Sequence, residues 1–273
     1  MLIAILKLVR YKNLLIISAV QFWIFYALFP NESVQEFLPL FVATISTAIG
    51  GYIINDYFDI EIDKINKEIV VTDSISKKIV LILYVFSLIV SVISSTSLPV
   101  QAFYTTLIII CFLFLYSFSF KKSPVLGNLV VSFCTALSIF IFYLTYKNQL
   151  NILLLYSVFA LDITFIRELI KDIEDIKGDE RMGAKTIPIL IGVQASKYLL
   201  YFIIVVSSFL WLIFSTSFGS LLYYLLVVII PFMIIIIYLI YRASEKKHYT
   251  MLTRLTKLIM ILGLFGLGVL IQY

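Results

Sequence analysis

The sequence is poor in the residues that keep a protein dissolved in water. Only 14% of its 273 residues are charged, and it has one histidine, six prolines and two cysteines. Cys111 and Cys134 both lie inside apolar runs and form no Cys-x-x-Cys pair, so neither a disulfide framework nor a zinc site is indicated. The scarcity of charge excludes a soluble globular domain of this length.

Hydrophobic residues make up 62% of the chain and gather in long runs. Most runs are close to the roughly 20 residues that a helix needs to cross a bilayer. They are solidly apolar rather than alternating, which favours helices over a membrane barrel. We therefore predict an all-α, multi-pass membrane bundle of nine transmembrane helices. The expected spans are 14–30, 37–54, 79–96, 101–119, 125–145, 152–168, 198–216, 221–241 and 257–271.

Lys and Arg are distributed very unevenly between the connections. With the N-terminus in the cytoplasm, 20 of the 21 Lys and Arg lie on the inner side, and only Lys147 lies outside. This is the asymmetry that the positive-inside rule describes. It predicts a cytoplasmic N-terminus, and it accounts for the net charge of +5 without a nucleic-acid partner.

Acidic residues gather at two places, after the second and the sixth expected spans. Each place carries three aspartates at i, i+3 and i+7, a spacing that puts them on one face of a helix. The two places are four spans apart, which indicates two four-helix repeats with one helix added, within a single domain covering 1–273. The aspartates are Asp56, Asp59 and Asp63 in the first motif and Asp172, Asp175 and Asp179 in the second.

Like charges at this spacing repel each other, so a bound cation is the expected reason for the pattern. Mg²⁺ is usually bound by one or two carboxylates together with phosphate groups of the substrate. If helix packing brings the two faces together, the ligand is a phosphorylated compound, with a diphosphate favoured. Arg167, Lys171 and Lys121 adjoin the motifs and would neutralise a leaving diphosphate.

Two other interpretations fit parts of the pattern. Either acidic run alone is typical of a solvated cytoplasmic loop. Both runs together would also suit a transporter of cations or lipid phosphates, although transporters place their sites near the bilayer midplane. Asp162 lies inside the sixth span, where a carboxylate is costly; it either pairs with a polar group in the bundle or reaches the acceptor pocket.

The motifs resemble those of the UbiA superfamily of intramembrane prenyltransferases. The first reads Asn55-Asp56-x-x-Asp59-x-x-x-Asp63, and a weaker third one has Tyr116-Ser117 before Lys121, Pro124, Gly127 and Asn128. The second is most similar to the geranylgeranylglycerol-phosphate geranylgeranyltransferase group. It reads Arg167-Glu168-x-x-Lys171-Asp172-x-Glu174-Asp175-x-x-Gly178-Asp179, followed by Gly183-x-x-Thr186-x-Pro188.

This resemblance implies transfer of a polyprenyl group, through an allylic carbocation, from its diphosphate to an acceptor. Mg²⁺ would be held by Asn55, Asp59, Asp63, Asp172, Asp175 and Asp179. Substrate contacts would come from Asn13, Asn55, Tyr116, Lys121, Asn128, Arg167 and Lys171. The residues implied to take part in catalysis are Asp56, Asp59, Arg167, Lys171 and Asp175, with either Asp56 or Asp175 positioning or deprotonating the acceptor.

The chain departs from the family pattern at three positions. Glu68 replaces a proline and Val70 replaces a basic residue after the first motif, and Tyr11 stands where the N-terminal Arg-Pro-x-Asn pattern has proline. The acceptor is therefore left as either a glycerol phosphate lipid or an aromatic quinone precursor. The expected location is the plasma membrane of a bacterium or an archaeon, among membrane lipids, with the aspartate motifs on the cytoplasmic side.

Overall fold

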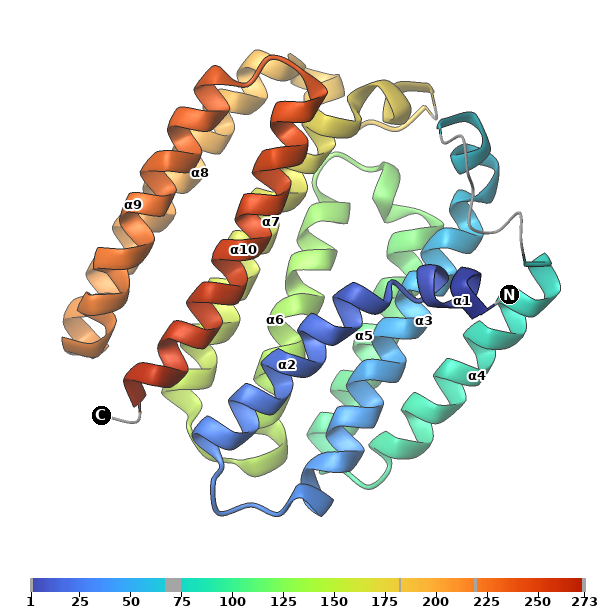
Figure 1. Ribbon diagram of the computed structural model, residues 1–273, viewed down its shortest axis with the longest axis vertical. Coiled ribbons are helices and arrows are strands. Elements are labelled where there is room, and N and C mark those ends of the chain that lie inside the picture. Colours follow the sequence, from blue (N-terminus) through green and yellow to red (C-terminus); the bar gives the residue numbers. More distant parts are fainter. Residues whose placement is uncertain (1, 67–74, 182, 219, 272–273) are drawn as a thin grey trace. The chain divides into compact units, whose positions relative to one another are not determined.

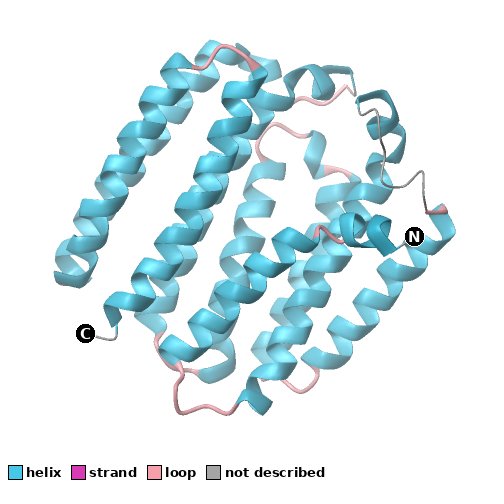
Figure 2. Ribbon diagram, in the orientation of Figure 1, coloured by secondary structure: helices cyan, strands magenta, loops and turns pink. Residues whose placement is uncertain are grey.

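The computed structural model describes the backbone of residues 2–66, 75–181, 183–218 and 220–271. Side chains are described for residues 3–59, 75–181, 183–213 and 230–263. Throughout this part of the chain the regular structure is helical and contains no strand (Figure 2). The predicted all-α class is therefore confirmed.

Each expected span lies in a helix of its own (Figure 1). Most helix ends lie within a few residues of the ends of the expected spans; the exceptions, of about a dozen residues, are the C-terminal ends of α3 and α7, which continue through the motifs, and the starts of α8 and α10. Their bounds are α1 Leu2–Leu8, α2 Tyr11–Leu28, α3 Val34–Asn66, α4 Lys77–Ser95, α5 Val100–Phe118, η2 Phe120–Lys122, α6 Leu126–Tyr146, α7 Leu150–Arg181, α8 Ile187–Phe218, α9 Ser220–Arg242 and α10 Lys246–Ile271.

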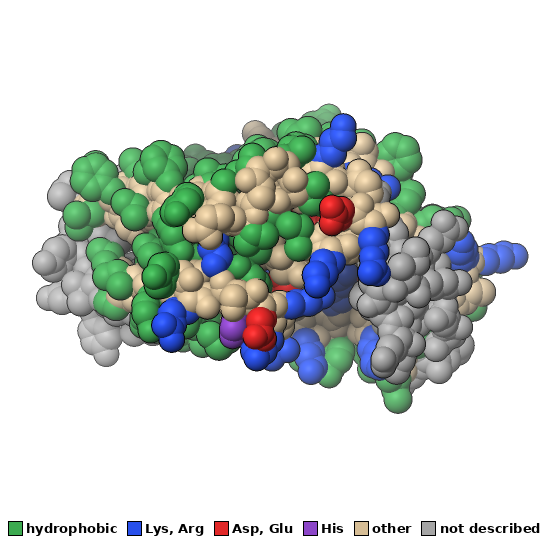
Figure 3. Space-filling view, turned by 90° about the horizontal axis from the view of Figure 1, so that it is seen from above, with side chains coloured by type: hydrophobic (Ala, Val, Ile, Leu, Met, Phe, Trp, Pro, Cys, Tyr) green, Lys and Arg blue, Asp and Glu red, His purple; other side chains and the backbone are tan. Residues whose placement is uncertain are grey.

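Seven of the described helices, from α2 to α8, are long and apolar enough to cross a membrane. In α9 the described apolar stretch, Ile230–Arg242, is shorter. The chain is thus a multi-pass membrane protein, while the count of nine spans stays a prediction. Figure 3 shows Lys and Arg side chains beside Asp and Glu on a face of the molecule that also carries many hydrophobic side chains.

The chain forms two compact units. The first comprises residues 1–121 and 133–157, and the second comprises residues 122–132 and 158–273. The prediction of a single domain over 1–273 is not tested by this division.

In the first unit, small residues bring α3 and α4 close together. Ser87, Ser91 and Ser95 of α4 are buried at four-residue intervals, so they share one helix face. The Ser91 hydroxyl lies 2.6 Å from the Thr47 hydroxyl of α3, and a Cβ on Gly50 would lie only 2.9 Å from the Ser87 Oγ. Small and hydroxyl-bearing residues allow this approach inside a membrane.

In the second unit, α9 packs against both α8 and α10 (Figure 1). Helix α7 is joined to α8 and α10 by side chains: Phe159 meets the Trp211 ring edge-on, with centroids 5.9 Å apart, and its ring also contacts Gly263. Helical geometry in α8 is interrupted at Gly192, where φ is 82°, a value that glycine adopts most readily.

The two motif-bearing helices are longer than the apolar layer of a bilayer. Helix α3 has 33 residues and α7 has 32, so each is about 50 Å long, whereas the hydrocarbon core is about 30 Å thick. Each motif lies toward the C-terminal end of its helix. The extra length thus lets these ends reach past the apolar layer while the rest of each helix stays within it.

Both helices have defined ends. Ser33 and Glu36 form a reciprocal capping box at the start of α3. After α7, Gly183 adopts a left-handed conformation with φ 66°. The Ala184 N–H donates to the Asp179 carbonyl and the Gly183 N–H to the Glu180 carbonyl, which is a Schellman motif. Helix α7 thus ends directly after its third aspartate.

Candidate functional site

The first motif is a network of charged and amide groups on the last part of α3. Asn55 Nδ2 donates to Asp59 Oδ2 at 2.9 Å, and Lys121 Nζ, from η2, pairs with the same oxygen. Asp59 is buried, with only 8% of its surface exposed. The sequence predicted that Asn55, Asp59 and Lys121 share a site, and the structure brings these three residues together.

Arg10 completes this network, although the sequence analysis assigned it no role there. Its Nη2 lies 2.8 Å from Asp56 Oδ1, and its guanidinium lies over the Tyr52 ring. Burial works against the charge of Arg10, but the charge and hydrogen bond of Asp56, together with Tyr52 and Tyr116, raise the pKa of the guanidinium overall. Arg10 has a φ of 50°, an uncommon conformation for a residue other than glycine.

The remaining predicted residues of this motif are less fully defined. Asp63 lies in α3, but its side chain is outside the described residues, as are the departures at Glu68 and Val70. Asn13 lies in the first turn of α2, where its N–H donates to the Arg10 carbonyl. Tyr116 lies in α5 and interacts electrostatically with Arg10. The predicted substrate contacts of Asn13 and Tyr116 remain untested.

The second motif lies on α7 and is built in the same way, from carboxylates that meet polar groups of other elements. Asn128, near the start of α6, donates to Asp172 Oδ2 at 2.8 Å. Lys246, in the first turn of α10, lies 3.6 Å from Asp175 Oδ1, and both side chains are well exposed. The pairing of Asn128 with Asp172 joins two residues that the sequence analysis placed at the site.

Glu168 is a functional candidate that the sequence analysis did not single out. It is buried, accepts a hydrogen bond from Arg167 Nη1, and lies 3.8 Å from Lys171 Nζ. The two cations predicted to bind phosphate are thus held by one carboxylate. Arg167 Nε is buried without a hydrogen-bond partner among the described residues, so it remains available to donate to an anion. The spacing of Glu168 to Lys171, i and i+3, was the available clue.

Asp162 pairs with polar groups inside the second unit. Ser207 Oγ donates to its Oδ1 at 2.6 Å and Trp211 Nε1 to its Oδ2 at 3.3 Å, both from α8. Of the two possibilities left open by the sequence, the contacts show pairing within the bundle. This carboxylate therefore holds α7 and α8 together.

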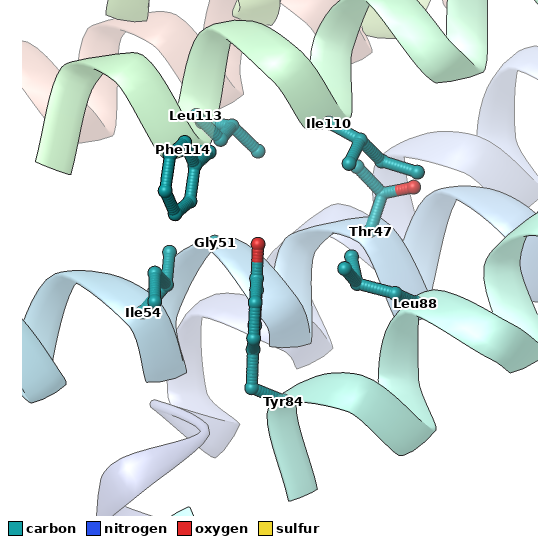
Figure 4. A pocket seen from close by; sticks show the side chains of 8 residues that line it. All are labelled: Thr47, Gly51, Ile54, Tyr84, Leu88, Ile110, Leu113 and Phe114. Atoms are coloured by element: carbon teal, nitrogen blue, oxygen red, sulfur yellow. The ribbon is translucent and has the colours of Figure 1, made fainter. Parts of the chain in front are cut away.

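A small apolar pocket lies between α3, α4 and α5 (Figure 4). About 170 Å³ between these helices is not filled by atoms, part of it open to solvent, and Ile54, the residue before Asn55, is among its lining residues. The side chains that line it carry two hydroxyl groups and no charge. The lining residues are Thr47, Gly51, Ile54, Tyr84, Leu88, Ile110, Leu113 and Phe114.

The donor groups of both motifs fit Mg²⁺ in kind, because they are carboxylate and amide oxygens. No cluster of three or more His, Cys, Asp and Glu able to hold a metal occurs among the described side chains. Such a cluster is not required, since Mg²⁺ takes several of its ligands from water and substrate phosphates. The Asp59 carboxylate already pairs with the Lys121 ammonium, which is consistent with a site that suits a cation.

Comparison with known proteins gives a family match over most of the chain. The model of the UbiA prenyltransferase family matches residues 14–268. The digeranylgeranylglyceryl phosphate synthase of Sulfurisphaera tokodaii is 35% identical over 176 residues, 60% of this chain and 61% of that protein. That of Sulfolobus acidocaldarius is 34% identical over 203 residues, 71% of each chain.

Solved structures show the same fold. One from work on digeranylgeranylglyceryl phosphate synthase has a TM-score of 0.78 at 24% identity, and the match covers 100% of this chain and 99% of that one. A UbiA homologue from Archaeoglobus fulgidus, bound to GPP and Mg²⁺, has a TM-score of 0.70 at 19% identity, covering 97% and 99%. These likenesses extend over nearly the whole chain.

Proposed function

Because the chain belongs to the UbiA prenyltransferase family, we propose that it transfers a prenyl group, geranylgeranyl in our assignment, from its diphosphate to a glycerol phosphate lipid. The observation that carries this proposal is the group formed by Asn55, Asp59 and Lys121. It combines oxygen ligands for a divalent cation with an ammonium group that suits a diphosphate.

The choice of substrates rests on the relatives. Curated relatives of this chain are named digeranylgeranylglyceryl phosphate synthases, and a homologue of similar fold was solved with GPP and Mg²⁺. These names favour a lipid acceptor over an aromatic quinone precursor. They also favour transfer over the alternative of cation or lipid-phosphate transport.

Residues of both motifs would hold Mg²⁺, which supplies positive charge for the departure of the diphosphate. In the first motif these are Asn55, Asp59 and Asp63. Lys121 already lies at the Asp59 carboxylate, so its ammonium would bind diphosphate oxygens beside the metal. The second set comprises Asp172, Asp175 and Asp179, with Arg167 and Lys171 as further diphosphate contacts.

The transfer breaks the bond between the allylic carbon and the diphosphate oxygen and forms a bond from that carbon to the acceptor hydroxyl oxygen. The hydroxyl proton must then be taken up. Arg10 holds Asp56 through Oδ1, and Asp56 Oδ2 has no hydrogen-bond partner among the described residues. We therefore assign the proton to Asp56 Oδ2, whereas Asp175 serves the metal.

The proposal extends to how the chain lies in the membrane. We propose that 1–273 acts as one prenyltransferase domain with nine spans and a cytoplasmic N-terminus. The excess of Lys and Arg on one set of connections supports this orientation. The membrane would be that of an archaeon, as for the relatives named above.

The test uses purified protein in lipid, labelled geranylgeranyl diphosphate and Mg²⁺. Acceptors are geranylgeranylglyceryl phosphate and, separately, an aromatic hydroxy acid. We expect mass spectrometry to show a metal-dependent prenylated glycerol lipid and released diphosphate. A product only with the aromatic acid would overturn the acceptor assignment. Absence of diphosphate release with every acceptor would refute the transferase and leave the transport alternative.

A further inference from the structure

Helix α10 presents one polar face to the second motif. Lys246, Thr250, Thr253 and Lys257 are spaced at four, seven and eleven residues from the first, so they lie on the same side of the helix. This face meets α7 in antiparallel order. Lys246 lies near Asp175, the two threonines contact Glu174, and Lys257 interacts electrostatically with Arg167.

Both carboxylate oxygens of Glu174 are engaged by this face. Thr250 Oγ1 lies 2.7 Å from Oε1, and Thr253 Oγ1 lies 3.0 Å from Oε2. Each hydroxyl has a single proton and also lies near a carbonyl of its own helix. For Thr250 the carboxylate is the nearer acceptor, at 2.7 Å against 3.2 Å, whereas for Thr253 the carboxylate and the Tyr249 carbonyl are nearly equidistant, at 3.0 Å and 2.9 Å. Each oxygen of Glu174 therefore has a hydroxyl group of α10 within hydrogen-bond distance.

Because of where Glu174 lies on α7, its contact with α10 affects the direction in which the aspartates of the second motif point. At 3.6 residues per turn, Glu174 lies about 160° around the helix from Asp172. Asp175 and Asp179 lie within about 60° of Asp172. A helix held on the Glu174 side thus keeps Asp172 and Asp179 turned away from α10, while Asp175, about 100° from Glu174, lies beside Lys246 of α10. Rotation of α7 about its axis would move all three together.

We propose that Glu174 is a positioning residue whose contact with Thr250 and Thr253 fixes the rotation of α7 and so the placement of the second aspartate motif. The inference rests on the proposed function, in which the second aspartate motif binds a metal ion and a diphosphate. Glu174 itself is not a ligand in this assignment, since both of its oxygens face α10. The occupants of the aspartate face are a divalent cation and a diphosphate.

The test separates position from charge. Replacing Thr250 and Thr253 together by Val removes the two contacts and leaves the charge of Glu174 intact, while replacing both by Ser keeps the hydroxyls. Glu174→Gln keeps the shape and removes the charge. Glu245→Gln is the control, because the Glu245 side chain is exposed and pairs with Lys247 in a surface contact.

The experiment measures the affinity for Mn²⁺ in the presence of inorganic pyrophosphate. Electron paramagnetic resonance detects the bound Mn²⁺. Loss of groups that orient metal ligands typically weakens affinity about 10- to 100-fold. We expect a loss of this size in the Val pair, and affinity close to wild type in the Ser pair and in Glu245→Gln. Circular dichroism should show that the Val pair keeps its helical content.

Several results would overturn the inference. One is unchanged Mn²⁺ affinity in the Val pair with a loss confined to Glu174→Gln, which would mean that the charge acts rather than the position. An equal loss in the Ser pair, a general loss of helical structure, or no binding by the wild-type protein would do so too. Because the assay needs no prenyl group, a failure of prenyl transfer alone would refute the proposed function and not this inference.

Discussion

At the scale of single residues, the motif carboxylates are held by groups from distant parts of the chain. Arg10 meets Asp56 and Lys121 meets Asp59, across 46 and 62 positions. The spacing of the aspartates could be read from the sequence because it repeats along one helix. The Arg10 contact could not be predicted from the sequence, because it depends on how α2 packs against α3. In the sequence, Arg10 is one of many Lys and Arg residues on the inner side.

The Arg10 contact predicts a specific loss of stability. Arg10→Met removes the ion pair and leaves the largely buried Asp56 carboxylate without its donor. We expect a loss of about 1–3 kcal/mol, which is usual for hydrogen bonds to charged groups. Thermal unfolding in detergent measures it, with the exposed neighbour Lys12→Met as control. Equal melting temperatures for Arg10→Met and wild type would show that the pair contributes nothing.

Asp162 and Ser207 offer a test of a polar contact inside the membrane. Ser207→Ala leaves one oxygen of Asp162 without its donor and should cost about 1–3 kcal/mol. Replacing both partners by apolar residues is often close to neutral, so Asp162→Leu combined with Ser207→Ala should cost less than the two single changes added. Unfolding of all four proteins gives this cycle. Strictly additive costs would mean that the two side chains are not coupled.

At the scale of elements, the apolar parts of the helices could be predicted from the sequence. The length by which α3 and α7 continue beyond those parts could not. Apolar runs located each span, because hydrocarbon burial requires about 20 apolar residues. The aspartate spacing indicated that the motifs are helical, but the runs could not show that α3 and α7 continue into them without a break, since charged residues end an apolar run without ending a helix. The interruption at Gly192 also escaped prediction, because glycine occurs both inside and between helices.

The packing of α10 against α7 gives a prediction at this scale. A methyl group on Gly263 would collide with the ring of Phe159, which is buried and held by Trp211. Gly263→Ala should therefore destabilise the protein by about 1–3 kcal/mol through overpacking. Leu262→Ala, at an exposed neighbouring position, should have a much smaller effect on the melting temperature. The reverse order would contradict the α7–α10 contact.

At the scale of the whole molecule, composition and charge asymmetry led to the correct fold class. The family match confirms the similarity inferred from the aspartate motifs. The division into two compact units was not foreseen, because α6 and α7 each contribute to both units and nothing in the sequence marks a boundary within a continuous helix. The number of spans and the orientation in the membrane remain predictions.

Orientation can be tested by cysteine labelling. In a background with Cys111 and Cys134 replaced, a single cysteine is placed at Asn148→Cys, between α6 and α7, or at Ser244→Cys, between α9 and α10. The positive-inside rule predicts that an impermeant maleimide labels the first in intact cells and the second only after permeabilisation. The opposite pattern would place the N-terminus outside.

The central claim of the proposed function is that each of the two aspartate motifs is required for the departure of the diphosphate, and one measurement addresses it most directly. Release of diphosphate from labelled geranylgeranyl diphosphate is compared for wild type, Asp59→Asn, Asp175→Asn and the surface variant Glu245→Gln, with Mg²⁺ present or chelated. We predict metal-dependent release by wild type and Glu245→Gln, and a loss of at least about 100-fold in each aspartate variant. Full release by either aspartate variant would contradict the account, because one of the two motifs would then be dispensable.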